Sequence, residues 1–391
     1  MNLWTYIRKE KVMTVALSLA IVSALFVHPD HKYWDYIDWR VLALLFCLMV
    51  VVKGIQDIGV FDIFIQKLYR KVDHLRSIIR MLVLMCFFGS MVITNDVALI
   101  TFVPFAIVAL KTAKQEKYLI ITVILQTLAA NLGSMFTPIG NPQNLYLFSA
   151  ANMSIVEFFG TMWPVTLLSF VLLMLAVQLI IPTTKLEPIE NGNFSIQEGN
   201  RISIDLSVQK KTDSDGMGKK CESICYTILF GIDLLVVFHA IHWAAAFIIT
   251  ILGILLMRKK ELFAKVDYAL LLTFVGFFVF IGNIGRVPAI SQMVQELLEG
   301  REVWMSALFS QFMSNVPAAI LLSGFTNRYQ ALLLGTNIGG LGTLIASMAS
   351  LISYKLYAEE PGSSRGKYFI QFTIWNIIGL IILLAAAFFI Y

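Results

Sequence analysis

Long apolar runs follow one another along the chain and are separated by short segments that carry most of the charge. About 20 apolar residues in a helix are enough to cross the roughly 30 Å hydrocarbon core of a bilayer. The pattern predicts apolar helices at about 12–27, 41–55, 81–110, 118–152, 161–181, 224–239, 243–257, 267–285, 303–325, 331–352 and 368–390. Such a series is typical of a polytopic α-helical membrane protein.

Polar residues interrupt two of these runs near their centres. The run 81–110 contains Thr94-Asn95-Asp96, which leaves two arms of about 13 residues, or about 20 Å at 1.5 Å per residue, too short for a full crossing. The run 303–325 repeats this arrangement around Ser314-Asn315. Two short apolar arms around a polar tip are typical of a re-entrant hairpin, so we predict one at each position.

A third polar interruption extends from Asn131 to Asn144, inside the apolar run 118–152, with the sequence NLGSMFTPIGNPQN. Irregular backbone is tolerated at membrane depth only where protein or a water-filled cavity surrounds it. In transporters, such broken helices mark the binding site. The alternative interpretation is an ordinary surface loop between two helices.

Three sequence blocks occur twice, in the same order. Residues 131–139 align without gaps to 337–345 through the shared pattern N-x-G-[SG]-x-x-T-x-I, which predicts a second broken helix within 331–352. The two hairpin tips form the second pair, and Asp38 and Asp267, each before an apolar run, form the third. We infer an internal repeat, because a surface loop gives no reason for a copy.

Basic residues predict the orientation, because cytoplasmic loops are enriched in Lys and Arg. The N-terminal flank, the loops on both sides of the first hairpin and the polar segment 182–222 are all basic. They lie on one side of the membrane if the first hairpin is re-entrant. The first repeat, 1–181, and the segment 223–391, a linking helix plus the second repeat, then have opposite orientations. The predicted fold is all-α, with an inverted-topology repeat, a cytoplasmic linker at 182–222, a cytoplasmic N-terminus and a C-terminus outside.

Composition narrows the function classes. Hydrophobic residues make up 58% of the chain and charged residues 14%, against about 25% charged in soluble proteins. Basic cytoplasmic loops explain the net charge of +5, so no nucleic-acid partner is predicted. The four Cys form no CxxC pair or Cys/His cluster, which predicts no metal site and no cofactor. No nucleophile–base arrangement or HExxH motif lies in the apolar runs, so no enzyme is expected.

The tips and breaks offer the chemistry of a transporter site. Helix N-termini suit anions, and free carbonyls with Asn, Ser and Thr oxygens suit a small cation. The predicted substrate- and ion-binding residues are Thr94, Asn95, Asp96, Asn131, Gly133, Ser134, Thr137, Gly140, Asn141, Asn144, Ser314, Asn315, Thr336, Asn337, Gly339, Gly340, Thr343 and Ser347. The coupling ion is expected to be a proton or Na⁺, with Na⁺ at Asn95, Asn315 and the breaks.

Asp96 is the one acidic residue in a hairpin tip. A carboxylate inside the membrane is costly and should be either paired or functional. We expect Asp96 to carry a proton or to bind a cation. The alternative is that it caps the N-terminus of the second hairpin arm.

These motifs resemble the ion-transporter superfamily that includes arsenite-efflux permeases, citrate and dicarboxylate permeases, silicon-efflux carriers and sodium/proton antiporters. Thr94-Asn95-Asp96 with VALITFVP is similar to the A-N-D tip of arsenite permeases. Thr137-Pro138-Ile139-Gly140-Asn141-Pro142 is similar to the family's G-T-P-x-N break, and Ser314-Asn315-Val316-Pro317 to its N-N-M-P tip. The resemblance covers nearly the whole chain. It implies a secondary carrier whose hairpins and broken helices shift against a scaffold in an elevator-like movement.

The expected function is therefore gradient-driven transport of a small anion or oxyanion, such as a carboxylate, an arsenite-like species or an inorganic anion. One alternative is a sodium/proton antiporter that uses Asp96, and a less favoured one is a channel, which would need a continuous polar pore. No ATP-binding motif is present, so the energy must come from a gradient or from a partner ATPase, and of these two a cytoplasmic ATPase partner is not expected. We expect a multi-pass protein of the plasma membrane, surrounded by lipid, and leave a homodimer open.

Overall fold

The computed structural model describes residues 10–59, 74–185, 193–197, 201–205, 215–238 and 240–390. The chain folds into two compact units. Unit 1 consists of Met1–Ile58, Leu145–Ile155 and Ser214–Thr336, and unit 2 of Gly59–Asn144, Val156–Asp213 and Asn337–Tyr391. Each unit takes segments from both halves of the sequence.

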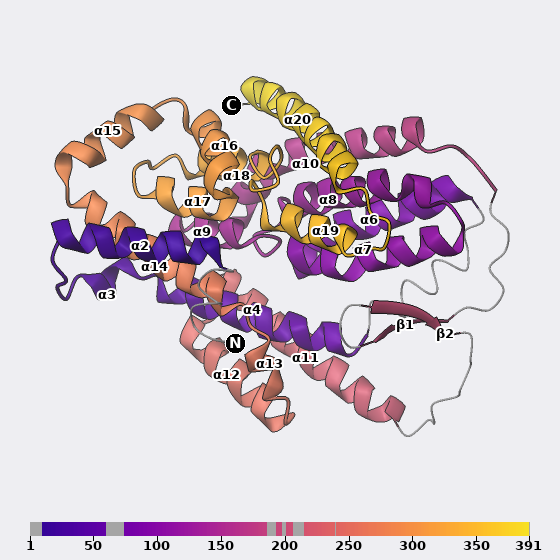
Figure 1. Ribbon diagram of the computed structural model, residues 1–391. Helices are drawn as coiled ribbons and strands as arrows, with labels where there is room; N and C mark the ends of the chain where they lie inside the picture. The colour runs from indigo at the N-terminus through magenta and orange to yellow at the C-terminus, as the bar shows by residue number, and fades with distance from the viewer. Residues whose placement is uncertain are drawn as a thin grey trace. The chain divides into compact units, whose positions relative to one another are not determined.

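Unit 1 is a set of packed helices in the part of the chain that the structure describes. Its helices are α2 (Lys11–Phe26), α3 (Tyr33–Tyr36), α4 (Trp39–Asp57), α11 (Asp215–Val237), α12 (Trp243–Leu256), α13 (Glu261–Ala264), α14 (Tyr268–Gly285), α15 (Pro288–Leu298), α16 (Glu302–Met313) and α17 (Asn315–Ser323). Helix α2 packs along α14, and α4 packs against α11 and α12 (Figure 1). A Cβ added at Gly276 would lie 2.9 Å from the Ala16 carbonyl carbon, so this glycine permits the close approach of α14 to α2.

Unit 2 contains the first hairpin and the helices around it. They are α6 (Leu75–Ile93), α7 (Asn95–Thr112), the 3-10 helix η1 (Glu116–Tyr118), α8 (Leu119–Ser134), α10 (Ile155–Ile180), α19 (Met348–Ala358) and α20 (Arg365–Ile390). Helices α6, α7 and α8 pack against one another, and α19 packs on α7 and α8 (Figure 1). The short helices α9 (Pro142–Ala150) and α18 (Tyr329–Ile338) begin in one unit and end in the other.

The prediction of an all-α polytopic membrane protein is confirmed. Within the described residues, seven helices are long and apolar enough to cross a membrane: α4, α6, α7, α8 together with η1, α10, α14 and α20. The linker predicted at 182–222 contains two short antiparallel strands, β1 (Asn193–Gln197) and β2 (Arg201–Asp205). Helix α11 begins at Asp215, earlier than the apolar run predicts, because its first turns are polar. The basic residues at 1–9 and 60–73 lie outside the described part of the chain.

Each predicted hairpin and each predicted broken helix corresponds to two helices with a polar interruption between them. The expectation that the arms of the first hairpin are too short to cross a membrane is wrong, because α6 and α7 are both candidate membrane spans. Helices α6 and α7 have 19 and 18 residues, about 28 and 27 Å, instead of about 13 residues each. The apolar pattern misses the start of α6 because Arg76 and Arg80 lie there. Arg76 Nε donates to the Ile181 carbonyl at 2.6 Å, and Arg80 donates to Gln178 at 2.7 Å. The arms of the second hairpin, α16 and α17, are short, with 12 and 9 residues. Re-entrance into the membrane and opposite orientation of the halves stay predictions.

The aspartates of the third repeated block have the same local geometry. Asp38 is the N-cap of α4, and its Oδ1 accepts a hydrogen bond from the Val41 amide at 3.0 Å. Asp267 is the N-cap of α14, and its Oδ1 accepts from the Leu270 amide at 2.9 Å. A side chain in this position satisfies one of the free N–H groups at a helix start. The sequence repeat thus corresponds to a repeated capping structure.

Replacing either capping aspartate with alanine should lower the free energy of unfolding by about 0.5–2 kcal/mol, because one helix N–H loses its acceptor. Asp38→Asn and Asp267→Asn should retain most of the stability, since asparagine caps about as well. Thermal unfolding of the detergent-purified variants checks this. Asp35→Ala, at an exposed position of α3, is the matched control. Alanine variants as stable as the asparagine variants would contradict the capping role.

Candidate functional site

The two hairpin tips share an unusual backbone conformation. Thr94, between α6 and α7, has φ 68° and ψ 153°, and Ser314, between α16 and α17, has φ 77° and ψ 154°. This region is populated almost only by glycine, and a side chain there costs on the order of 1–3 kcal/mol. In both tips an asparagine begins the next helix. Strained residues of this kind cluster at ligand-binding and switch regions.

Hydrogen bonds join the first tip to the break after α8. Asn95 is buried, and its Nδ2 donates to Asn131 Oδ1 at 3.2 Å. The Asn95 backbone N–H donates to the Gly140 carbonyl at 3.2 Å. Thr137 adds a third bond, because its hydroxyl donates to the Met91 carbonyl near the end of α6 at 2.5 Å. The polar tip is therefore anchored within unit 2.

Asn144 closes the break between α8 and α9. Its Nδ2 lies within hydrogen-bond distance of three carbonyl oxygens, those of Ser134 at 3.2 Å, Met135 at 3.4 Å and Thr137 at 3.0 Å. A helix C-terminus leaves carbonyls without intrahelical partners, and in an apolar environment they need other donors. One asparagine side chain supplies that donor, which explains how irregular backbone persists between two apolar segments.

The two predicted breaks meet in one hydrogen-bond network within unit 2. Asn337 Nδ2 donates to Asn144 Oδ1 at 2.6 Å, and Asn141 Nδ2 donates to Asn337 Oδ1 at 3.3 Å. Ser347, which precedes α19, donates to Asn131 Oδ1 at 3.0 Å. The Ser134 hydroxyl donates to the Asn131 carbonyl at 3.0 Å and accepts from Asn141 Nδ2 at 2.7 Å. Asn131 and Asn337, equivalent in the sequence repeat, therefore belong to the same network. The role of these residues in binding stays a prediction.

Asp96 lies in the first turn of α7 and is half-buried. The alternative interpretation of Asp96 as an N-cap is wrong, because Thr94 occupies the N-cap position and α7 already begins at Asn95. A carboxylate in the first turn interacts favourably with the positive end of the helix dipole. It also disfavours an anion at this helix start. The first turns of α9 and α19 contain no acidic residue.

Not every predicted residue belongs to unit 2. Ser314, Asn315 and Thr336 belong to unit 1. The Ser314 hydroxyl donates to Asn315 Oδ1 at 3.4 Å, and the Thr336 hydroxyl donates to the Leu332 carbonyl of its own helix at 2.7 Å. Thr343 is exposed.

The predicted glycines have mixed surroundings. A Cβ at Gly140 would lie 2.1 Å from the Ser134 carbonyl oxygen, so Gly140 permits a compact turn. Gly339 and Gly340 lie in the second break, directly after α18 ends at Ile338.

Sequence reasoning missed Gln143, between Pro142 and Asn144 in the first turn of α9. Its side chain is fully buried, yet neither Oε1 nor Nε2 has a hydrogen-bond partner among the described residues. Asn141 Oδ1 also has no hydrogen-bond partner among the described residues, although Asn141 is only 2% exposed. Buried polar atoms are hydrogen-bonded in the great majority of cases. Side-chain amides at the start of α9 thus have donor and acceptor atoms without hydrogen-bond partners. The amide-rich sequence NPQN is the feature from which Gln143 could have been predicted as a site residue.

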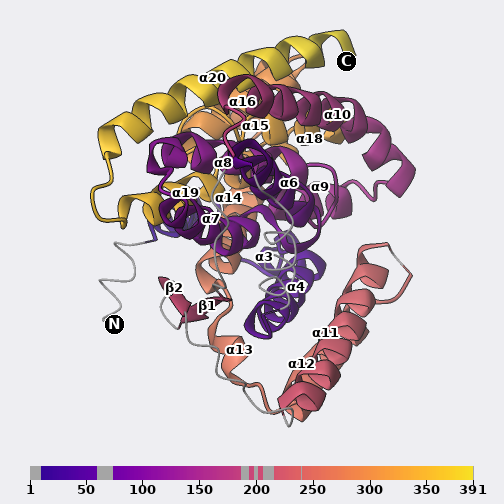
Figure 2. The same cartoon turned by 90° about the vertical axis from the view of Figure 1, so that its right-hand side faces the viewer.

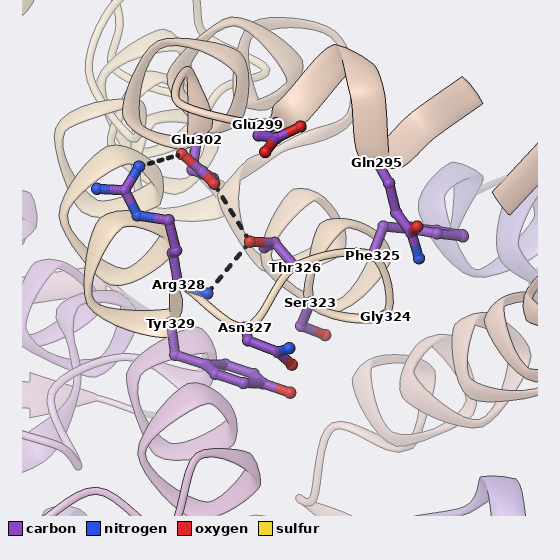
Figure 3. Close-up of a pocket in the computed structure, with 10 residues that line it drawn as sticks. All are labelled: Gln295, Glu299, Glu302, Ser323, Gly324, Phe325, Thr326, Asn327, Arg328 and Tyr329. Atoms are coloured by element: carbon purple, nitrogen blue, oxygen red, sulfur yellow. Dashed lines mark hydrogen bonds and ion pairs between the residues drawn. The ribbon is translucent and has the colours of Figure 1, made fainter. Parts of the chain in front are cut away.

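A separate pocket of about 600 Å³ lies in unit 1, between the α15–α16 turn and the loop that follows α17 (Figure 3). Glu302, whose side chain is 3% exposed, accepts from Thr326 at 3.3 Å and from Arg328 at 3.2 Å. The one arginine that lines the pocket is therefore already paired with a carboxylate. This arrangement does not favour the pocket as an anion site.

Comparisons with known proteins agree with the resemblance. A family model described as "Citrate transporter" matches residues 2–327. An uncharacterized transporter of Methanocaldococcus jannaschii is 30% identical over 380 residues, which is 96% of each chain. The inner membrane protein YbiR of Escherichia coli is 27% identical over 351 residues, 89% of this chain and 88% of that protein. A putative transporter arsB of Dictyostelium discoideum is 25% identical over 123 residues, 32% of this chain and 22% of that protein.

Gly133→Ala should destabilise unit 2, because the new Cβ would lie 2.0 Å from the Phe87 carbonyl oxygen and force α8 away from α6. The expected loss in unfolding free energy is about 1–3 kcal/mol, as for other overpacked sites. Gly160→Ala is the matched control, because no atom lies within 4 Å of that Cβ position in α10. Thermal unfolding of both variants in detergent measures the difference. Equal melting temperatures would show that α6 and α8 do not pack this closely.

Proposed function

The chain belongs to the citrate transporter family, and on that premise we propose that it is a secondary active carrier of a small anion or oxyanion, driven by an ion gradient. The membrane-spanning character and the transporter class follow from the family and the apolar helices. The class of substrate is our proposal. A carboxylate such as citrate is the first candidate, and arsenite-like or inorganic oxyanions are further ones.

One observation carries this proposal: the buried Nε2 and Oε1 atoms of Gln143, which have no hydrogen-bond partner among the described residues. They lie at the start of α9, where the helix dipole favours negative charge. The Gln143 Nε2 adds two N–H donors to this helix end. Donors without competing carboxylates suit an anion, and the first turn of α9 contains no acidic residue.

The coupling ion would bind at a different part of the same network. Asp96 disfavours an anion at the start of α7 and suits a proton or a cation there. Oxygens of Asn95 and of the nearby break could complete a sodium site, with Asn315 as the equivalent position in the second hairpin. An anion-favouring and a cation-favouring helix end in one hydrogen-bonded network would let the binding of one ion influence the binding of the other.

We propose that alternating access is of the elevator type. The first tip and both breaks are joined by side-chain hydrogen bonds within unit 2, from Asn95 through Asn131 to Ser347 and from Asn141 through Asn337 to Asn144. Elements tied together in this way would move as one body. The protein would act as a multi-pass carrier in the plasma membrane with a cytoplasmic N-terminus.

A sodium/proton antiporter that uses Asp96 is the second candidate. The observation in its favour is the position of this half-buried acid, which directly follows Asn95 and therefore lies at the edge of the buried amide network. A carboxylate beside amide oxygens suits either a proton or a small cation. In that case Asp96→Asn would abolish sodium-driven proton movement, and no anion would bind.

Counterflow in proteoliposomes tests the proposal. Vesicles loaded with unlabelled citrate should take up external labelled citrate faster than empty vesicles, because a carrier exchanges substrate across the membrane. Succinate, sulfate and arsenite are tested in the same way. Equal uptake with and without internal substrate would indicate a pore. If none of the four anions exchanges while a sodium gradient drives proton movement, the anion proposal is wrong and the antiporter is favoured.

The variant Gln143→Leu should lose anion binding without losing stability, which distinguishes a binding role of Gln143 from a structural one. Removing the amide should weaken binding of the transported anion by about tenfold or more, since a hydrogen bond to a charged group contributes about 1.5–3 kcal/mol. Stability should be unchanged or higher, because a buried amide without partners is removed while its volume is kept. Counterflow at graded citrate concentrations and thermal unfolding give the two measurements.

Gln292→Leu, an exposed glutamine on α15, is the control and should leave transport unchanged. A loss of both stability and transport in Gln143→Leu would instead assign Gln143 a structural role.

A further inference from the structure

Asp233 is a buried acid outside the site described above. It lies in α11 of unit 1, and its side chain is fully buried. The Thr250 hydroxyl of α12 donates to Asp233 Oδ1 at 3.2 Å. Oδ2 has no hydrogen-bond partner among the described residues. Helices α11 and α12 pack against each other, and both pack against α4 (Figure 2).

Few polar groups surround this carboxyl. From α4, Cys47 lies beside Thr250 and Asp233. Arg40 of α4 also reaches α11, but its Nη2 donates to the Val236 carbonyl at 3.1 Å. Helix α12 contains no titratable residue. The nearest other titratable groups along α11, Cys225 and Tyr226, lie about two turns before Asp233.

An ionised carboxylate is not stable in this environment. Removing a charge from water costs several kcal/mol unless a counter-charge and several hydrogen bonds replace the water. Asp233 forms no ion pair within the described part of the chain, and one hydroxyl donor does not compensate the loss. The neutral acid avoids this penalty. Acidic residues inside the helix bundles of membrane proteins mark ion pathways and proton relays.

We propose that Asp233 is a proton-binding site of the carrier. The carboxyl holds a proton while α4, α11 and α12 are packed together, and it releases the proton when this packing opens to water. On release, the O–H bond of the carboxyl breaks, its electron pair stays on the carboxylate, and a water molecule accepts the proton. This inference rests on the proposed transport function. It adds a second acid to Asp96 and makes the proton the coupling ion.

Infrared spectroscopy of the full-length protein in phosphatidylethanolamine–phosphatidylglycerol vesicles tests the protonation state without any substrate. The wild type and Asp96→Asn should both show the C=O stretch of a protonated Asp233 carboxyl at neutral pH, and this band should be absent from Asp233→Asn. Thr250→Val, which removes the hydroxyl donor but keeps the acid, should shift the band to higher frequency. An unchanged spectrum in both Asp233→Asn and Thr250→Val would overturn the proposal, because Asp233 would then be ionised.

A second measurement tests coupling. In the same vesicles with a pH-sensitive dye inside, citrate uptake by the wild type should move protons, and Asp233→Asn should lose the proton movement while keeping citrate counterflow. Asp233→Asn preserves an acceptor for Thr250, so a purely structural role predicts no such separation. Proton movement equal to that of the wild type would overturn the proposal.

The two proposals fail in different ways. Absence of citrate counterflow in the wild type would count against citrate as substrate, and the infrared band would still decide the protonation of Asp233.

Discussion

The need to satisfy backbone polar groups away from water governs the first broken helix of this protein. A broken helix in apolar surroundings leaves carbonyls at one end and N–H groups at the other, and each costs several kcal/mol without a partner. Asn144 resolves the first half of this problem by offering its amide to three carbonyls after α8. At the start of α9, Pro142 has no N–H group and the Asn144 N–H donates to the Asn141 carbonyl at 3.1 Å. The side-chain amide of Gln143 is therefore the donor that supplies the proposed anion site.

The same constraint explains why asparagine recurs at the equivalent positions of the repeat. An asparagine side chain both donates and accepts, so it can join two breaks without adding charge. Asn337 uses both functions, donating to Asn144 and accepting from Asn141. In the proposed carrier, a neutral network of this kind would leave the helix dipoles and the Asp96 carboxylate to determine where an anion and a cation bind.

The acids of the chain have different surroundings and therefore different proposed roles. Asp38 and Asp267 cap helices and are explained by local structure. Asp96 interacts with a helix dipole at the edge of the amide network. Asp233 is buried with a single hydroxyl donor, which local structure does not require. Proton coupling through Asp233 and anion binding near Gln143 would place the two functions in different units.

The order of apolar and polar residues determined the membrane class, the helices, the hairpin tips and the repeated Asn and Asp blocks, because these depend on periodicity and on neighbouring residues. The apolar pattern did not predict the true start of α6, because Arg76 and Arg80 lie in its first turns. Both arginines are hydrogen-bonded to residues distant in sequence. Only the tertiary structure joined Asn131 to Ser347 and Asn141 to Asn337, and only it assigned Ser314, Asn315 and Thr336 to the other unit. It also singled out Gln143 and Asp233, because whether a buried polar atom has a partner depends on residues distant in sequence, which no local pattern encodes.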